Sequence, residues 1–230
     1  QRAQDLYAVF CAGDLVLTDA RTAEMAKLTE NSFRDVNIAF ANELSVICER
    51  MGIDVWELID LANRHPRVNI LRPGPGVGGH CIAVDPWFIV SAAPREARLI
   101  RTARQVNDAK PGYVIGRVHQ ALEGREFPTV AALGLTFKAD VDDLRESPAL
   151  AIVRELALST PDAAILAVEP NISGPPAALR DLDSVQMVGT REAIARADVV
   201  LLLVDHREFR DLDPGMLTGR TVIDTRGAWR

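Results

Sequence analysis

The sequence predicts an α/β protein in which an all-helical region is followed by a parallel β-sheet with helices on both faces. The first half carries apolar residues at three- and four-residue steps, which is typical of helices. The second half contains short β-branched runs that alternate with helical stretches, which is typical of parallel sheets. The 230 residues are 48% hydrophobic and 25% charged, as in ordinary globular proteins, and can form one large domain or two small ones.

The first predicted helix covers residues 22–51, with Thr22 as its N-cap and Gly52 as its C-terminal stop. We expect one face of this helix to be buried. The residues spaced along that face are Met25, Leu28, Ser32, Val36, Ala39, Phe40, Leu44, Ile47 and Met51.

Further helical stretches complete the first half. A short helix is expected after Asp54, a third over residues 94–110 up to Pro111, and another over residues 112–124. Residues 1–20 do not form a domain by themselves, because "RAQDLYAVF" and "DLVLTD" resemble a closing helix and strand of a preceding domain.

Four short apolar runs in the second half are predicted to be strands. They cover residues 129–135, 162–170, 197–205 and 220–227, with helices expected at 147–159 and 190–197. Ligands on such sheets bind beyond the carboxyl ends of the strands, and there the sequence places "TFKADVDDLRES", "EPN", "DHREF" and "DTRG".

Charge and composition exclude several classes of function. The 26 basic and 32 acidic residues leave a net charge of −6 without any Lys/Arg block, which argues against a nucleic-acid or membrane partner. The apolar runs are too short to span a bilayer, no leader is evident, and we expect a cytoplasmic protein. The three cysteines cannot all pair and no Cys/His cluster indicates a metal, so we predict a reducing compartment and no metal site.

One loop, "GPGVGGHCIAVD" at residues 74–85, places a cysteine after a run of glycines and prolines. Glycine admits positive φ angles and lets a ligand approach the backbone. Cys81 is therefore a candidate nucleophile, although a buried apolar filler explains it as well. Cys11 has no polar residues near it that could activate a thiol, and Cys48 falls on the buried face of the predicted helix, so neither is a candidate nucleophile.

Two further groups of polar residues could take part in chemistry. Lys27 and Asn31 are four residues apart on one helix face. If Lys27 points into a cleft beside Cys81, it could favour the thiolate and stabilise an oxyanion; otherwise it extends into solvent.

Asp85 is either a candidate general base or a turn-forming aspartate. A dyad of His80 with Cys81 is unfavourable, because adjacent side chains in a loop point apart.

Lys138 and Arg145 follow a predicted strand and could bind a diphosphate, with Ser147 as the N-cap of the next helix. Solvated charges explain this stretch nearly as well, because it contains no GxGxxG or Walker sequence.

The chain resembles the UDP-glucose/GDP-mannose dehydrogenase family of NAD-dependent nucleotide-sugar 6-dehydrogenases. Three segments carry the resemblance, in the family's order and spacing: "AEMAKLTENSFRDVNIAFANE", "GPGVGGHCIAVDP" and "GLTFKADVDDLRESP". The stretches "VWELIDLANRHPRVNIL" and "HCIAVDPWFIV" are most similar to the branch that oxidises UDP-N-acetyl-D-mannosamine.

This resemblance implies a domain organisation. Residues 1–20 would be the remnant of the end of an N-terminal NAD-binding domain, residues 21–110 a central helical dimerisation domain with the catalytic cysteine, and residues 111–230 a Rossmann-like UDP-binding domain. No strand followed by GxGxxG occurs, so NAD would be bound mainly by a domain absent from this chain, which would be inactive alone. The implied partners are a UDP-N-acetylhexosamine substrate and a second copy in a homodimer.

The resemblance also implies roles for matched residues. Cys81 would hold the C6 aldehyde as a thiohemiacetal and then the acyl group as a thioester, because oxidation to the acid removes four electrons and NAD accepts two at a time. Lys27 and Asn31 would stabilise the oxyanion and position water, and Asp85 would assist thioester hydrolysis.

Other matched residues would bind the substrate or lie near the cofactor. The implied substrate-binding residues are Arg67, Gly76, Gly78, Gly79, Lys138 and Arg226. Of these, Arg67 would extend into the neighbouring subunit's site, and the glycines would let the loop fold against sugar and diphosphate. Arg145 would lie near the cofactor and the domain junction.

Two alternatives remain open from the sequence. One is a UDP-N-acetyl-D-glucosamine 6-dehydrogenase, since "GHC" followed by "VDP" also occurs in that branch. The other, of a different class, is a stand-alone UDP-binding or scaffold module.

Overall fold

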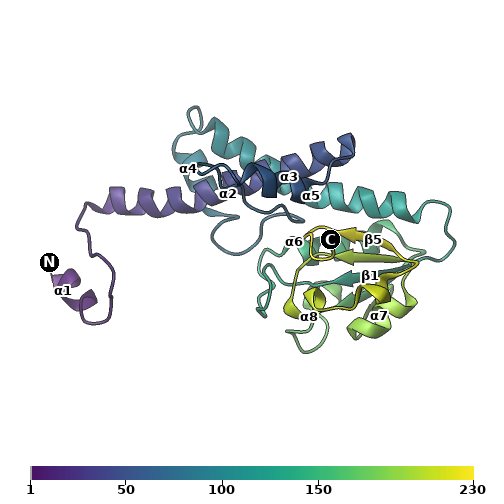
Figure 1. The fold of residues 1–230 in the computed structure, drawn as a ribbon. Coiled ribbons are helices and arrows are strands. Elements are labelled where there is room, and N and C mark those ends of the chain that lie inside the picture. The colour runs from purple at the N-terminus through teal and green to yellow at the C-terminus, as the bar shows by residue number, and fades with distance from the viewer. Residues whose placement is uncertain (1) are drawn as a thin grey trace.

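The protein, described here by a computed structural model of residues 2–230, has a helical part that packs against one side of a sheet part (Figure 1). The helices are α1 Arg2–Tyr7, α2 Ala20–Met51, α3 Val55–Ala62, α4 Asp85–Ala92, α5 Arg98–Leu122, α6 Pro148–Ser159, α7 Thr190–Arg196 and α8 Arg207–Arg210. The strands are β1 Thr129–Leu133, β2 Ala164–Val168, β3 Val185–Met187, β4 Val199–Leu202 and β5 Thr221–Asp224. Single 3₁₀ turns lie at η1 Ala177–Leu179 and η2 Pro214–Leu217.

Helix α2 begins two residues earlier than predicted, because Asp19 and not Thr22 is its N-cap. The Asp19 carboxylate accepts hydrogen bonds from the backbone amides of Arg21 and Thr22, both at 3.0 Å, and from the Thr22 hydroxyl at 2.7 Å. The predicted C-terminal stop is confirmed, since Gly52 adopts a left-handed conformation with φ of 67°.

The face that α2 buries overlaps the predicted apolar face only in part. The buried residues of α2 are Asn31, Ser32, Asp35, Ala39, Ala41, Asn42 and Cys48, so Ser32 and Ala39 are confirmed, whereas Met25, Phe40, Ile47 and Met51 are exposed. Asn31, Asp35 and Asn42 can be buried here because they hydrogen-bond to polar partners on α4 and α5. The prediction for Cys48, on the core face, is confirmed at 1% exposure.

Helix α5 continues through Pro111, so the prediction of two helices separated at this proline is wrong. The missing amide of Pro111 costs one helical hydrogen bond. The proline ring packs instead against the glycine-rich loop, where a Cβ at Gly76 would lie 3.3 Å from Pro111 Cγ. The expected domain boundary between residues 110 and 111 therefore falls inside one helix that contacts both parts of the chain.

The sheet is five-stranded, in the order β3-β2-β1-β4-β5, with all strands parallel. The four predicted strands are confirmed with shorter bounds. The edge strand β3 was missed, because three residues with one exposed side chain give too short an apolar pattern.

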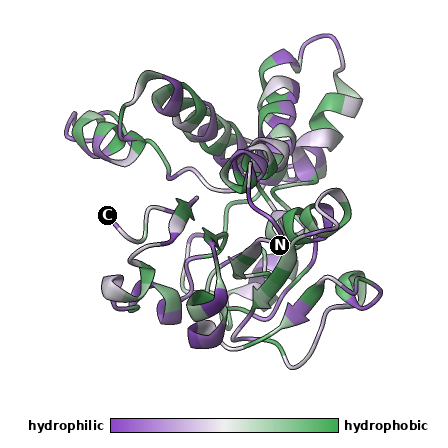
Figure 2. Ribbon diagram, turned by 90° about the vertical axis from the view of Figure 1, so that its right-hand side faces the viewer, coloured by the Kyte–Doolittle hydropathy of each residue, from purple (hydrophilic) through white to green (hydrophobic). Residues whose placement is uncertain are grey.

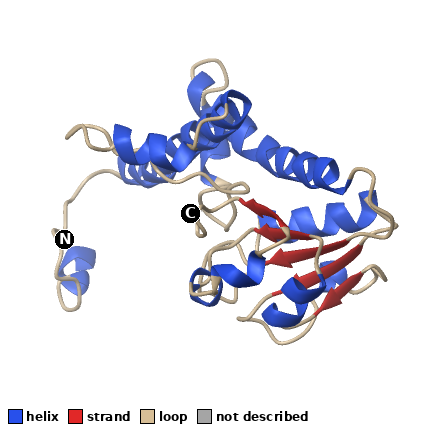
Figure 3. Cartoon of the chain, turned by 45° about the vertical axis from the view of Figure 1, so that its right-hand side comes forward, coloured by secondary structure: helices blue, strands red, loops and turns tan. Residues whose placement is uncertain are grey.

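Helices cover both faces of this sheet, as Figure 3 shows, and the predicted α/β class is confirmed. Successive side chains of β1 enter opposite layers: Val130 and Ala132 pack with α5 and α6, whereas Ala131 and Leu133 pack with α7. Burial on both faces explains the continuous apolar runs of the strands. In Figure 2 the strands are mostly hydrophobic, and the helices above them mix hydrophobic and hydrophilic residues.

At the N-terminal end, α1 forms where a helix was expected, but the strand expected at residues 14–19 is absent. A strand needs a neighbouring strand to pair with, and residues 2–230 place none beside this segment. None of the helices within these residues combines the length and apolar character needed to cross a lipid bilayer.

Candidate functional site

The glycine-rich loop at residues 74–79 lies between the helical part and the sheet part. A Cβ at Gly78 would lie 2.4 Å from the backbone oxygen of Glu146, and one at Gly79 would lie 3.0 Å from the Phe137 ring. Gly79 also has a φ of 87°, and its amide donates to the Arg145 carbonyl at 3.2 Å. These two glycines therefore permit close contact with the sheet part, whereas the sequence suggested that they leave room for a ligand.

A cavity of about 220 Å³ opens beside this loop, at the carboxyl ends of β1, β4 and β5. Three of the predicted substrate-binding residues line it: Gly76, Lys138 and Arg226. The Arg226 guanidinium donates from Nε to Asp205 Oδ1 at 2.8 Å and lies against Gly74, where a Cβ would be 2.5 Å from Nη1. The cavity lies where the strand order reverses, between β1 and β4, which is the position at which such sheets bind ligands.

Cys81 lies in the turn that leads into α4. Its carbonyl accepts from the amides of Val84 at 3.0 Å and Asp85 at 2.8 Å, and its side chain is half-buried. Arg145, in the segment that contacts Gly79, pairs through Nη2 with Asp143 Oδ2 at 2.6 Å, and this pairing raises the pKa of Arg145.

Helices α2 and α4 bring two predicted catalytic residues into contact. Asn31 Nδ2 donates to Asp85 Oδ2 at 2.6 Å, and Asn31 is only 2% exposed. Lys27, one turn earlier on α2, donates instead to Glu30 Oε2 at 2.7 Å with 62% of its side chain exposed. Within residues 2–230 no hydrogen bond or ion pair joins Lys27 to Cys81 or Asp85. Its expected orientation into a cleft beside Cys81 is therefore not seen.

Arg67 is exposed in the loop after α3 and does not line the cavity of Gly76, Lys138 and Arg226. Its role at a neighbouring subunit stays a prediction. Among residues 2–230 no three His, Cys, Asp or Glu side chains are grouped to hold a metal ion.

Sequence reasoning missed a buried polar seam between α2 and α5. Asn42, on α2, is fully buried. Its Nδ2 donates to Asn107 Oδ1 at 2.9 Å, and its Oδ1 accepts from the Gly74 amide at 2.8 Å. Asn107 in turn donates to Asp35 Oδ1 at 2.8 Å, and Arg104 donates to the same oxygen at 2.6 Å. The seam thus connects the helix pair to the glycine-rich loop.

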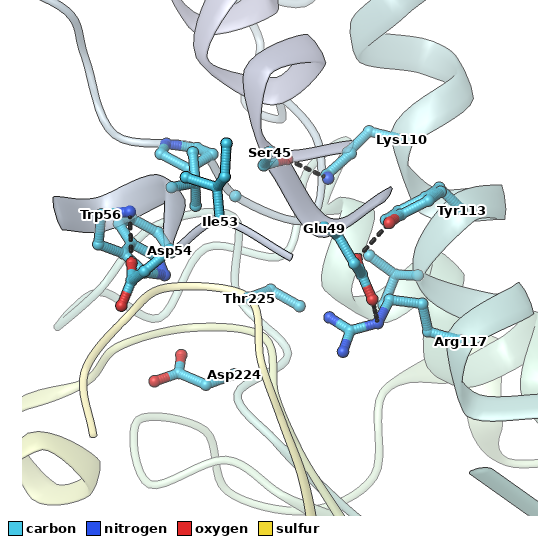
Figure 4. A pocket seen from close by; sticks show the side chains of 14 residues that line it. Ser45, Glu49, Ile53, Asp54, Trp56, Lys110, Tyr113, Arg117, Asp224 and Thr225 are labelled. Carbon is cyan, nitrogen blue, oxygen red and sulfur yellow. Dashed lines mark hydrogen bonds and ion pairs between the residues drawn. The ribbon is translucent and has the colours of Figure 1, made fainter. Parts of the chain in front are cut away.

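A second cavity, of about 310 Å³, lies on the other side of this loop, between α2, α3, α5 and the end of β5 (Figure 4). Lys110 donates to Ser45 Oγ at 2.6 Å and lies over the Tyr113 ring. Burial lowers the pKa of Lys110 to about 8, although Glu49 opposes the shift. The Glu49 carboxylate accepts from the Tyr113 hydroxyl and pairs with Arg117 at 2.6 Å, and it does not contact Lys110. Within residues 2–230 Lys110 forms no ion pair with a carboxylate.

Comparison with known proteins identifies both parts of the chain. Residues 21–109 match the central domain of the UDP-glucose/GDP-mannose dehydrogenase family, and residues 131–230 match its UDP-binding domain. The chain belongs to this family. The resemblance recognised in the sequence is thereby confirmed.

Relatives within the family have related names. The chain is 62% identical over 229 residues to an NDP-N-acetyl-D-galactosaminuronic acid dehydrogenase of Ralstonia solanacearum, covering 100% of this chain and 53% of the relative. It is 55% identical over 237 residues to the UDP-N-acetyl-D-mannosamine dehydrogenase of Escherichia coli (strain K12), covering 100% of this chain and 56% of the relative. The chain therefore spans about half the length of the curated relatives it matches.

A solved structure of this family has the same fold. The UDP-N-acetyl-mannosamine dehydrogenase from S. aureus is 43% identical, with a TM-score of 0.82, over 99% of this chain and 53% of that one.

Dehydrogenases of this family use NAD, and residues 2–230 do not fit a dinucleotide. The turn after β1 reads GLTFKAD and not GxGxxG, and β1 is not followed directly by a helix N-terminus. Arg145, the one residue expected near the cofactor, is paired with Asp143. No chemical step through NAD is therefore derived from these residues.

Proposed function

We propose that this chain is the substrate-binding and dimerisation part of a UDP-N-acetyl-D-mannosamine 6-dehydrogenase. The observation that carries the proposal is the cavity where Gly76, Lys138 and Arg226 meet, in a chain that matches the family's UDP-binding domain. We further propose that NAD is bound mainly outside these residues and accepts the hydrides of the reaction.

The cavity suits the diphosphate of a nucleotide sugar. Lys138 and Arg226 place two positive charges at its wall, although the whole chain carries a net charge of −6. Asp205 orients the Arg226 guanidinium through Nε and so leaves its other nitrogens free to bind phosphate oxygens. Gly76, at a φ of 147°, lets the loop pass close to Pro148 and Pro111 at the edge of the cavity.

Cys81 would be the nucleophile that retains the substrate between the two oxidations. Its thiolate would hold the aldehyde as a thiohemiacetal and the acyl group as a thioester. Asp85, held at 2.6 Å by Asn31, would assist water in releasing the acid. Lys27 can join this site only by leaving its ion pair with Glu30.

A second copy of the chain would cover the apolar residues that α2 leaves exposed. Phe33 is 68% exposed, Phe40 51% and Met51 65%, which is unusual for one helix of a monomer. A homodimer formed along α2 would also allow the exposed Arg67 to reach the other subunit's site. The three free cysteines are compatible with a cytoplasmic location, which we propose for the enzyme.

The Cys81→Ser variant of the complete enzyme tests the mechanism. We expect acid formation to be abolished while the affinity for the UDP-sugar stays nearly unchanged, because the thiol acts on C6 and not on the nucleotide. The Cys48→Ser variant is the matched control, since Cys48 is buried on the core face of α2. Unchanged turnover of Cys81→Ser would remove Cys81 from the mechanism.

Two other epimers are candidate substrates. The relative at 62% identity favours an N-acetyl-D-galactosamine nucleotide, and the sequence itself left the gluco epimer open. Initial rates with the manno, galacto and gluco forms of UDP-N-acetylhexosamine decide among them. Binding of UDP by the complete protein without oxidation of any epimer would instead indicate a UDP-binding or scaffold module.

A further inference from the structure

A buried histidine lies beneath the loop that carries Lys138. His206, which follows β4, is 1% exposed, and Glu169, at the end of β2, has a fully buried side chain. His206 Nε2 lies 3.1 Å from Glu169 Oε2. Neither residue lines the cavity with Lys138, so the proposed binding of UDP does not account for them.

The hydrogen bonds of His206 define where its ring proton lies. Nδ1 accepts from the backbone amide of Asp140 at 2.9 Å and lies 3.0 Å from Asn171 Nδ2, so it faces two donors and is unprotonated. Nε2 then carries the proton and donates it to Glu169. Glu169 Oε2 also accepts from the amides of Leu135 at 2.8 Å and Thr136 at 3.1 Å. Burial alone would raise the pKa of Glu169, but these donors hold it below its usual value.

The same contacts restrain the backbone on both sides of Lys138. Before it, the Thr136 hydroxyl donates to the Lys138 carbonyl at 2.9 Å. After it, Asp140 adopts a left-handed conformation with φ of 60°, which for a residue other than glycine persists only when its surroundings enforce it. The bond from the Asp140 amide to His206 Nδ1 restrains this conformation from below the loop, and the Asp140 carboxylate also accepts from the Arg207 amide at 2.9 Å.

We propose that His206, oriented by Glu169, is the positioning residue that holds the 136–140 loop in the shape that presents Lys138 to the diphosphate of the substrate. This inference rests on the proposed function, because it takes Lys138 to bind the UDP moiety. The atom that matters is the acceptor Nδ1, since it receives the Asp140 amide; the donor Nε2 serves to fix the ring.

Two substitutions separate the two ring nitrogens. The amide oxygen of asparagine can occupy the place of Nδ1, so His206→Asn keeps an acceptor for the Asp140 amide and loses the contact with Glu169. The amide nitrogen of glutamine can occupy the place of Nε2, so His206→Gln keeps the donor to Glu169 and loses the acceptor. A role in packing alone would make the two variants similar in both stability and UDP affinity.

The experiment is calorimetric titration of the 230-residue chain with UDP, with thermal unfolding of each variant as the control for folding. We expect His206→Gln to weaken UDP binding about tenfold and His206→Asn to stay within about twofold of the wild type, at similar melting temperatures. Lys138→Ala should also weaken binding, but it should add little in the His206→Gln background, because the lysine is already misplaced there.

Three outcomes would overturn the inference. His206→Gln could bind UDP with wild-type affinity, or the losses of affinity from His206→Gln and Lys138→Ala could add fully in the double variant. The third outcome is a tenfold loss of UDP affinity in His206→Asn. The last result is decisive even if His206→Gln does not fold. Failure of the wild-type chain to bind UDP would instead reject the proposed function, and this inference with it.

Discussion

Replacing Lys110 by methionine should change how the stability of the protein depends on pH. Lys110 is buried at 7% exposure, donates only to Ser45, and has a pKa of about 8 where an unfolded chain has 10.5. Methionine has a similar length and no charge. Ser45 keeps its own bond to the Asn42 carbonyl at 2.6 Å, so no hydroxyl donor is left unpaired.

The sign and size of the effect follow from these two pKa values. The folded state binds the Lys110 proton less tightly than the unfolded state, so stability increases as pH rises from about 8 towards 10.5 and is lost as pH falls through 8. When the pH rises from about 7 to about 9, the free energy of unfolding of the wild type should therefore increase by about 1 kcal/mol relative to that of Lys110→Met. The whole difference between the two pKa values of Lys110 corresponds to about 3 kcal/mol.

Urea titrations followed by tryptophan fluorescence measure this difference, and Trp56 lines the same cavity as Lys110. Lys27→Met is the matched control, because Lys27 is 62% exposed in its side chain and its variant should follow the wild-type pH dependence. Parallel stability curves for the wild type and Lys110→Met over this pH range would refute the reasoning.

Three other predictions concern the loop, the seam and α2. Gly78→Ala should lower the free energy of unfolding by about 1–3 kcal/mol, because its Cβ would clash with the Glu146 carbonyl oxygen. The control Gly112→Ala should not destabilise the chain, since no atom lies within 4 Å of its Cβ. Equal urea midpoints for the two variants would contradict this prediction. Asn42→Ala should lower the free energy of unfolding, measured by chemical denaturation, by about 1–3 kcal/mol, because its buried partners are left unpaired. A decrease of less than about 0.5 kcal/mol would contradict a stabilising role for the buried polar seam. Phe40→Glu should shift sedimentation towards the monomer; an unchanged dimer would place the interface elsewhere.

Much of the sheet part could be predicted because its signals are local. The strands β1, β2 and β4 are short apolar runs that are almost entirely buried, and their length of four or five residues with β-branched residues favours strands over helices. Gly52 ends α2 through its own backbone preference. The short edge strand β3 could not be found, because its three residues form a strand only through pairing with β2.

The candidate site divides in the same way. Cys81 and Lys138 stood out by residue type and spacing, and the family resemblance assigned roles to them and to Arg226 before any contact was known. Asn42, Lys110 and His206 gave no such signal, since a polar residue in a helical or loop pattern usually faces water.

The sequence by itself determined the fold class and the family, because periodicity and short motifs are properties of neighbouring residues, and it proposed the candidate site residues. Only the tertiary structure decided which face of α2 is buried, why α5 continues through Pro111, and which segments meet at the glycine-rich loop. Those outcomes depend on partners distant in the chain. Asn42 can be buried because Asn107 and the Gly74 amide complete its hydrogen bonds, and no local pattern encodes that distance.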